Sequence, residues 1–308
     1  MQYNILNFPT DLYRCIQSYT NINTLLNTSS KLKTEKKELY YCKLDEYYST
    51  LYYRDLEFRN IINNVIKNTS KQLSLNLSDM HIGMIDANVL ENIHTLDLSG
   101  NGIEDASMFH NTYNLNLYGN KIKDASMLRN TTILNLGHTQ VEDVSTLGNV
   151  KFLNLKGTKV KDVSALKNVY NLNLERTSVK NVSMLGNVHK LNLNYTKVTD
   201  VSALGNVKLL SLEGTNVTDV SMLGNVYRLN LNHTKVTDVS ALGNVHSLLL
   251  FCTNVTDVSA LGNVRALYLI CCKNTIDVSA LGKVRKLNLC GTKVINANAL
   301  NNVKKLIL

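Results

Sequence analysis

The residues with the most chemical potential in this sequence are carboxylates that recur at a fixed spacing. A column of such side chains could hold Ca²⁺, which prefers oxygen ligands, but each repeat supplies one carboxylate and places Val nearby, unlike acid-rich calcium loops. An Asp two residues before a Ser can instead accept amide hydrogens at the start of a turn. We predict this capping role for Asp105, Asp124, Asp143, Asp162, Asp200, Asp219, Asp238, Asp257 and Asp277.

The other reactive side chains form no catalytic pattern. The sequence has no glycine-rich phosphate loop, no H-E-x-x-H and no nucleophile motif. The seven histidines are scattered, and His138 and His233 lie five repeats apart, or about 24 Å along a stack of strands. We therefore expect no enzymatic activity, cofactor or metal. The six cysteines are not spaced in pairs, so we expect reduced thiols, as in the cytosol. They are Cys15, Cys42, Cys252, Cys271, Cys272 and Cys290.

One further column mixes basic and aromatic residues, a combination that can follow a phosphate backbone. More often such a column is the solvated rim of a sheet, and the net charge of +9 is a mild surplus for 308 residues. We therefore do not expect nucleic acid as a partner. The column consists of Lys151, Tyr170, His189, Lys208, Tyr227, His246, Arg265, Arg285 and Lys304.

A 19-residue repeat must position all these side chains. Copies of L-x-L-x-x-T-x-V-x-D-V-S-x-L-G-N-V-x-x begin at Leu153, Leu172, Leu191, Leu210, Leu229 and Leu248. A period this regular is typical of a solenoid. The frame extends to about twelve coils with two longer spacings, 21 residues from Leu75 to Leu96 and 20 from Leu267 to Leu287. The second excess falls in residues 271–276, so we expect that turn to bulge.

In each coil the side chains of L-x-L alternate inward and outward, as in a strand. About five residues, Ser-x-Leu-Gly-Asn, then remain for the segment that returns the chain to the next strand. That is too short for a three-turn helix, so we expect a 3₁₀-like turn and stacked parallel strands. The repeat resembles a short leucine-rich repeat, a family that builds curved binding surfaces. The predicted fold class is α/β: a leucine-rich-repeat solenoid with parallel β-strands on the concave face and short 3₁₀-like turns on the convex face.

Recognition should depend on positions that vary between coils, because the framework columns are nearly constant. Thr or Asn fills one framework column after the strand, and Asn also predominates at the middle outward strand position. The departures there, Leu249 and Tyr268, lie beside Phe251 and Ile270 and should form an apolar island that marks a contact site. Local drift in the repeat, or cover by the chain's tail, would also explain them. The predicted partner-binding residues are Lys190, Asn192, Asn194, Arg228, Asn230, Leu249, Phe251, Tyr268 and Ile270.

The first seventy residues follow a helical period instead. Leu12, Cys15, Ile16 and Tyr19 are spaced as one stripe of an amphipathic helix, and residues 39–66 also read as helical. A helical cap over the first coil is the plain interpretation. We place boundaries at 1–45 for a small all-α region, 46–72 for a helical linker or cap, and 73–308 for the solenoid and a terminal strand.

The segment Phe8-Pro-Thr-Asp-Leu-Tyr-Arg-Cys-Ile-Gln-Ser-Tyr19, with Thr24-Leu-Leu and Ser29-Ser-Lys31, resembles an F-box. The resemblance implies docking on a Skp-type adaptor of a cullin-RING ubiquitin ligase while the repeats select the substrate. Phe8 stands where Leu is usual, and the tryptophan expected after Lys31 is missing. The residues that match the adaptor-binding pattern are Phe8, Pro9, Leu12, Ile16, Tyr19, Leu25 and Leu26.

The arrangement as a whole is similar to F-box/leucine-rich-repeat proteins of giant amoebal DNA viruses. We therefore predict a substrate-receptor subunit in the cytoplasm, the host's if viral; the alternative is a free-standing binding or scaffolding protein. No run approaches the roughly 18 apolar residues of a membrane span. The sequence stops within a thirteenth strand at residues 306–308, so we expect either weak self-association at that edge or an edge closed by the last residues.

Overall fold

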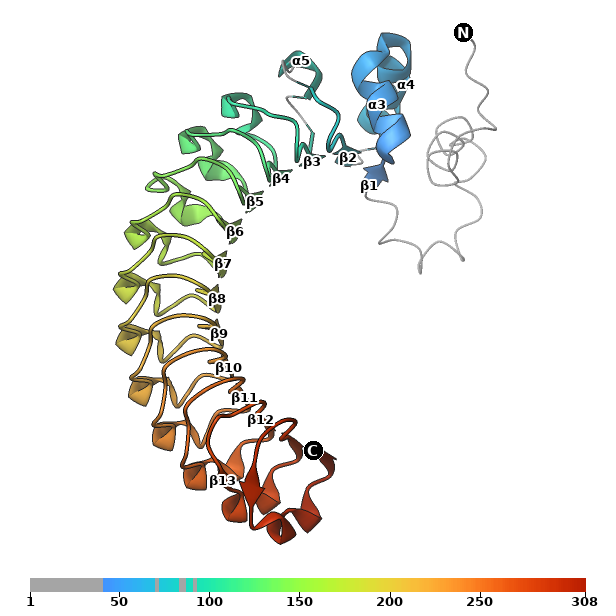
Figure 1. Cartoon of the computed structure of the whole chain (residues 1–308). Coiled ribbons are helices and arrows are strands. Elements are labelled where there is room, and N and C mark those ends of the chain that lie inside the picture. The colour runs from blue at the N-terminus through green and yellow to red at the C-terminus, as the bar shows by residue number, and fades with distance from the viewer. Residues whose placement is uncertain (1–40, 70–71, 83–86, 91–92) are drawn as a thin grey trace.

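The computed structural model describes residues 41–69, 72–82, 87–90 and 93–308. These residues form an arc in which strands line the inner side and short helical turns line the outer side (Figure 1). The strands form one parallel 14-stranded sheet in chain order, and a separate two-stranded sheet joins β13 and β15. The F-box-like residues lie outside the described part of the chain. Within that part, no helix has the length and apolar character needed to cross a membrane.

Most strands are three residues long, because each coil contributes only the first Leu of L-x-L and one residue on either side of it to the sheet. Consecutive strands pair in register, so Leu172 lies opposite Leu191 and Leu191 opposite Leu210. The strands are β1 Tyr41–Lys43, β2 Gln72–Asn76, β3 Thr95–Asp97, β4 Asn114–Asn116, β5 Ile133–Asn135, β6 Phe152–Asn154, β7 Asn171–Asn173, β8 Lys190–Asn192, β9 Leu209–Ser211, β10 Arg228–Asn230, β11 Ser247–Leu249, β12 Ala266–Tyr268, β13 Ile276–Asp277, β14 Lys286–Asn288, β15 Val294–Ile295 and β16 Lys305–Ile307.

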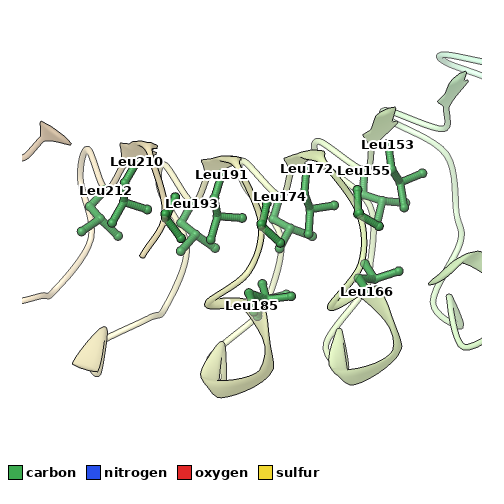
Figure 2. Close-up of a cluster of buried hydrophobic side chains, with 14 of the residues drawn as sticks. Leu153, Leu155, Leu166, Leu172, Leu174, Leu185, Leu191, Leu193, Leu210 and Leu212 are labelled. Atoms are coloured by element: carbon green, nitrogen blue, oxygen red, sulfur yellow. The ribbon is translucent and has the colours of Figure 1, made fainter. Parts of the chain in front are cut away.

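The core is a stack of leucine and valine layers rather than a single globule. From Leu75 to Leu289, both leucines of each L-x-L segment are buried. They meet the Leu of the 3₁₀ turn, as Leu172, Leu174 and Leu185 do in one coil (Figure 2). The Val residues of the coil close the layer from the other wall and are equally buried. Since each layer contacts chiefly its two neighbours, stability is built coil by coil. The predicted inward pattern is confirmed.

From the coil that starts at Leu96 onward, the return segment is a single 3₁₀ turn, as expected from its length. The turns are η3 Ser107–Phe109, η4 Ser126–Asn130, η5 Leu147–Asn149, η6 Ser164–Leu166, η7 Ser183–Leu185, η8 Ser202–Leu204, η9 Ser221–Leu223, η10 Ser240–Leu242, η11 Ser259–Asn263, η12 Ser279–Lys283 and η13 Ala297–Asn302.

The Asp column caps these turns, as predicted. Each of the nine carboxylates accepts the backbone N–H of the Ser two residues later at 2.8–2.9 Å, as Asp219 does from Ser221. That amide lowers the pKa of Asp219, while the neighbouring Asp200 and Asp238 carboxylates oppose the shift. Asn181 takes the same position and accepts from Ser183 at 3.0 Å, so a neutral acceptor can replace the carboxylate.

The predicted Thr and Asn column is also a framework feature. Asn101 and Asn120 are buried and donate to backbone carbonyls on two coils, for example from Asn120 Nδ2 to Leu98 and Leu117 at 2.9 Å. From Thr139 to Thr234 each hydroxyl donates to the carbonyl three residues earlier at 2.6–2.7 Å. These bonds satisfy carbonyls in the interior of the arc.

The N-terminal helices cover the first full coil. Helix α3 Glu46–Arg54 begins at Asp45, whose carboxylate accepts the Tyr48 amide at 3.0 Å, and α4 Leu56–Thr69 packs beside α3. The Ser49 hydroxyl accepts the Asn76 amide of β2 at 2.9 Å and thereby joins α3 to the sheet. Helical structure was expected throughout 39–66, but Tyr41–Lys43 is strand β1, because its backbone pairs with β2 and extends the sheet by one strand.

The two irregular spacings have local causes. The 21-residue coil contains the short helix α5 Ala87–Leu90 in place of a 3₁₀ turn. In the 20-residue coil, the expected bulge lies between Cys272 and Ile276, where Asn274 Nδ2 donates to the Asn254 carbonyl at 3.1 Å. After the bulge, Ile276 pairs with Val294, so the extra residue is followed by two short strands, β13 and β15.

Candidate functional site

The concave face presents three outward residues per coil, in rows that run along the arc. The first row precedes the first Leu of the strand, the middle row lies between the two Leu residues, and the last row follows the second; Lys190, Asn192 and Asn194 are examples. A rim row, such as His189, precedes the first row. A left-handed row, such as Tyr195, follows the last row and has positive φ. Any ligand on this face meets these five rows.

The middle row is occupied mainly by Asn residues whose amides are already bonded within the protein. Asn192 accepts the Asn194 amide at 3.0 Å through Oδ1 and donates from Nδ2 to Glu175 at 3.3 Å. Asn154 donates from Nδ2 to the Asn135 side chain of the previous coil at 2.8 Å. The Asn side chains of this row therefore support the sheet.

At two positions where the middle row loses its Asn, the preceding coil supplies the acceptor. Ser211 and Leu249 interrupt the row, and the amides that an Asn would have bonded there belong to Glu213 and Phe251. Glu213 N donates to Asn194 Oδ1 at 2.9 Å. Phe251 N donates to Asn232 Oδ1, also at 2.9 Å. At these two positions a last-row Asn thus replaces the missing acceptor, whereas the last row before Tyr268 holds Phe251.

Ion pairs and hydrogen bonds occupy the centre of the face. Lys156 Nζ lies 2.9 Å from Glu175 Oε1, and the Tyr195 hydroxyl donates to Glu213 Oε1 at 2.6 Å. The bond to Glu213 raises the pKa of Tyr195. The Arg176 guanidinium lies 5.4 Å from the centre of the Tyr195 ring. Both carboxylates of this region are therefore neutralised or hydrogen-bonded locally.

An apolar patch replaces polar residues toward the C-terminal end of the face. It consists of Leu249, Phe251, Tyr268 and Ile270, all half-buried. Leu249 pairs directly with Tyr268 across β11 and β12, so the two side chains lie on the same face. The Phe251 ring contacts His233 edge to face at 4.8 Å. The structure thus brings the four predicted island residues onto two adjacent coils.

The rim row contains stacked ring pairs that the sequence-based analysis missed. Tyr170 and His189 stack with centroids 4.6 Å apart, and Tyr227 and His246 stack at 4.4 Å. Ring planes in these pairs differ by 6° and 17°. The signal was available, because residues 19 apart in this row must lie side by side on adjacent strands.

The left-handed row was also missed. Its φ values lie between 50° and 71°, yet Gly occupies the row in only some coils. His138, Arg176, Tyr195, His233, Cys252 and Cys271 are among the non-glycine members. A large side chain here covers a Gly of the following coil: a Cβ on Gly214 would lie 2.5 Å from Tyr195 Cδ1. The recurrence of Gly at this position was the overlooked signal.

The predicted partner-binding residues divide into two groups in the structure. Lys190 and Arg228 are exposed in the first row, two coils apart. Asn192, Asn194 and Asn230 lie on the same face, but their amides take part in the internal bonds described above; Asn230 donates to Ser211 Oγ at 3.1 Å and accepts the Asn232 amide at 3.0 Å. The free side chains of the predicted site are therefore the cations and the apolar patch.

The cysteines near the patch are free thiols. Cys272 takes the Thr position of its coil, where burial raises the pKa of its thiol, while Cys271 and Cys290 are exposed. Among residues that the structure describes, no group of three or more His, Cys, Asp or Glu side chains could hold a metal ion.

Parallel three-residue strands, one 3₁₀ turn per coil and inward leucines define a leucine-rich-repeat solenoid, in agreement with the predicted fold class. Solved structures share this architecture. An internalin from Listeria monocytogenes aligns over 96% of this chain and 93% of its own, with TM-score 0.65 and 20% identity. A Leptospira interrogans leucine-rich-repeat protein covers 80% of this chain and 87% of its own, with TM-score 0.51 and 18% identity.

A further similar structure is the functional domain of InlJ from Listeria monocytogenes, which includes a cysteine ladder. The TM-score is 0.57 at 16% identity, over 77% of this chain and 56% of that chain. No known family model matches the sequence, and no curated protein matches it. At these identities the structural comparisons define the fold alone.

Proposed function

We propose that this protein is a protein-binding module whose concave face holds a partner at the apolar patch. The observation that carries the proposal is the replacement of framework Asn by Leu249 and Tyr268 in adjacent strands. An apolar cluster on an otherwise polar sheet is typical of a contact site. The leucine-rich-repeat architecture supports the proposal, since it offers a long concave surface.

The amide compensation at Asn232 gives independent support. Because Asn232 supplies the acceptor that Leu249 cannot, the change at Leu249 does not leave the Phe251 amide unsatisfied. Leu249 thus exposes apolar surface without leaving a backbone amide of its coil unpaired. The catalytic alternatives receive no comparable support from the side chains of the concave face.

The direct experiment is affinity capture with paired variants of the full chain. Phe251→Asn combined with Tyr268→Asn removes the rings of the patch. Phe152→Asn combined with Tyr170→Asn removes two rings that are 41% and 49% exposed on the same side of the arc, and serves as the matched control. We expect specific partners to be lost from the first variant and kept by the second. Identical retention by both variants would contradict the proposed site.

We further propose that the protein acts as the cytoplasmic substrate receptor of a cullin-RING ubiquitin ligase. The F-box-like segment from Phe8 to Lys31 supports this role, with Phe8 and Pro9 at its start and Leu25 and Leu26 in its second half. The described helices α3 and α4 connect that segment to the first coil. A target on the apolar patch would then be presented to the ligase.

Purified Skp-type adaptor tests this second role. The full chain should retain the adaptor, and Leu12→Asp with Ile16→Asp should abolish retention, whereas Lys161→Ala on the convex side should not. If the wild-type chain retains no adaptor, the protein is a free-standing binding protein and the N-terminal helices only cap the solenoid. The result leaves the apolar patch proposal standing.

We also propose weak self-association through strand β16. Leu306 and Ile307 are 37% and 38% exposed there. An edge strand of this kind can pair with another chain. Light scattering over a range of concentrations should show a rising mean mass, and a mass independent of concentration would refute this proposal.

A further inference from the structure

We propose that the apolar patch takes an acidic protein segment that carries aliphatic or aromatic side chains. This inference rests on the proposed protein-binding function and names the class of partner. It follows from the sign of the charges around the patch, from the small residues that lie between those charges, and from the ring faces that are already in contact with other side chains. Each of these is a property of residues 228–308, all of which the structure describes.

The charge around the patch has one sign. Residues 228–308 contain three acidic side chains, Asp238, Asp257 and Asp277. All three lie in the capping column of the convex turns, away from the five rows, and accept Ser amides there. The rim and first rows over the same coils instead hold Arg228, Arg265, Arg285, Lys286, Lys304 and Lys305. Every charged side chain in the five rows over residues 228–308 is thus a cation.

This arrangement differs from the centre of the face. There Lys156 is paired with Glu175 at 2.9 Å, so its charge is satisfied within the protein. Among residues 100–308, the ion pairs all lie between residues 104 and 176. Within residues 228–308 the basic side chains have no carboxylate on the same face, and the nearest one before them, Glu213, is already bonded to Tyr195 and Asn230. These basic side chains are therefore available to a partner.

The cations flank the patch on both sides with small residues between them. Strand pairing places Arg228 beside Ser247 and Ala266 beside Lys286, so the first row runs from cation through two small residues to cation. Ser247 and Ala266 lie directly next to Leu249 and Tyr268 along their strands. A partner can therefore place an apolar side chain over the patch and carboxylates on either side of it.

The aromatic rings near the patch are poorly suited to nucleobases. Stacking requires an open ring face. One face of the Tyr268 ring is taken by Lys286 Nζ, 5.0 Å from its centroid, and one face of the Tyr227 ring is stacked on His246. Leu249 and Ile270, the other half of the patch, have no ring. Aliphatic and aromatic side chains of a protein fit this surface better than bases do.

A random library of short displayed peptides, selected on the full chain, tests the inference. The recovered peptides should combine Asp or Glu with Leu, Ile, Phe or Tyr. Their affinity should fall about tenfold on Phe251→Asn and about tenfold on Arg265→Glu combined with Lys286→Glu. Lys197→Glu combined with Lys235→Glu, two exposed cations outside the five rows, is the matched charge control and should leave affinity unchanged. Binding should also weaken from about 50 to about 200 mM salt.

Each alternative result has a distinct meaning. Recovery of basic or uncharged peptides that still need Phe251 would overturn the acidic class and leave the proposed function intact. Peptides indifferent to the patch variants would overturn the assignment of their site. Recovery of no peptide, or binding of labelled oligothymidylate that is lost in the patch variants, would contradict both this inference and the proposed function.

Discussion

Replacing Thr131 with Val should stabilise the protein. Thr131 is 1% exposed, and its hydroxyl, like that of Thr112, is buried without a hydrogen-bond partner. In the following coils Val takes the same position, first as Val150. The backbone is equivalent, with φ and ψ of −66° and 135° at Thr131 and −63° and 132° at Val150. Val should therefore fit without a change in the coil.

The magnitude follows from the unpaired hydroxyl. Burying such a group costs about 1–3 kcal/mol, and the isosteric Val removes that cost. For a chain of this length, about 2 °C per kcal/mol gives a thermal midpoint about 2–6 °C higher. The backbone bond from Thr131 N to the Leu128 carbonyl, 3.1 Å, is kept, because Val150 makes the same bond to Leu147.

The assay is thermal and urea unfolding of two variants, Thr131→Val and its reverse, Val150→Thr, beside the wild type. Val150→Thr, the reverse change one coil later, should lower the midpoint by a similar amount. A Thr131→Val protein less stable than wild type, or a Val150→Thr protein equal to it, would refute the reasoning that the coils are equivalent and that the hydroxyl is unsatisfied.

Three further predictions concern the framework and the thiols. Gly214→Ala should lower the thermal midpoint more than Gly102→Ala, because both residues have positive φ but only at Gly214 would a Cβ meet a side chain; equal losses would contradict this. The hydrogen bond from the Ser221 backbone N–H holds the pKa of Asp219 below its unfolded value of about 3.9. The carboxylate therefore stabilises the folded protein above that pH, and this contribution is lost as pH falls through the folded pKa. Asp219→Asn should therefore lose less stability than wild type between neutral pH and about pH 3, and an equal loss would show that the carboxylate is not the cause. Iodoacetamide should modify exposed Cys290 well before buried Cys272, as peptide mass spectrometry would show; the opposite order would contradict the assigned burial.

The framework was predictable because its cause repeats. Each Leu, Val and Asp of the 19-residue unit meets the same environment in the next coil, so one interpretation applies to all copies. The same logic exposes the limits: nothing in the pattern marks Tyr41–Lys43 as a strand, since that segment precedes the repeat and gains its bonds from β2.

The candidate site was predictable only in part. The apolar patch could be predicted from the alternation of side chains along each strand, because residues on the same face of adjacent strands must lie side by side. The roles of Asn194 and Asn232 did not, since each accepts an amide from the next coil and serves a residue 19 positions away. The positive φ of Tyr195 likewise depends on comparison with the glycines of its row. Contacts in which a side chain of one coil serves a residue of the next coil could be found only in the structure.

The central claim is that the partner lies on the apolar patch, and a fluorescence titration tests it most directly. The chain contains no Trp, so Tyr268→Trp provides a single reporter within the patch, and Tyr170→Trp provides one on the rim outside it. Titration with the purified partner that the full chain retains should shift the emission of the Tyr268→Trp protein and leave that of the Tyr170→Trp protein unchanged. A shift confined to the Tyr170→Trp protein, at equal affinity, would contradict the claim.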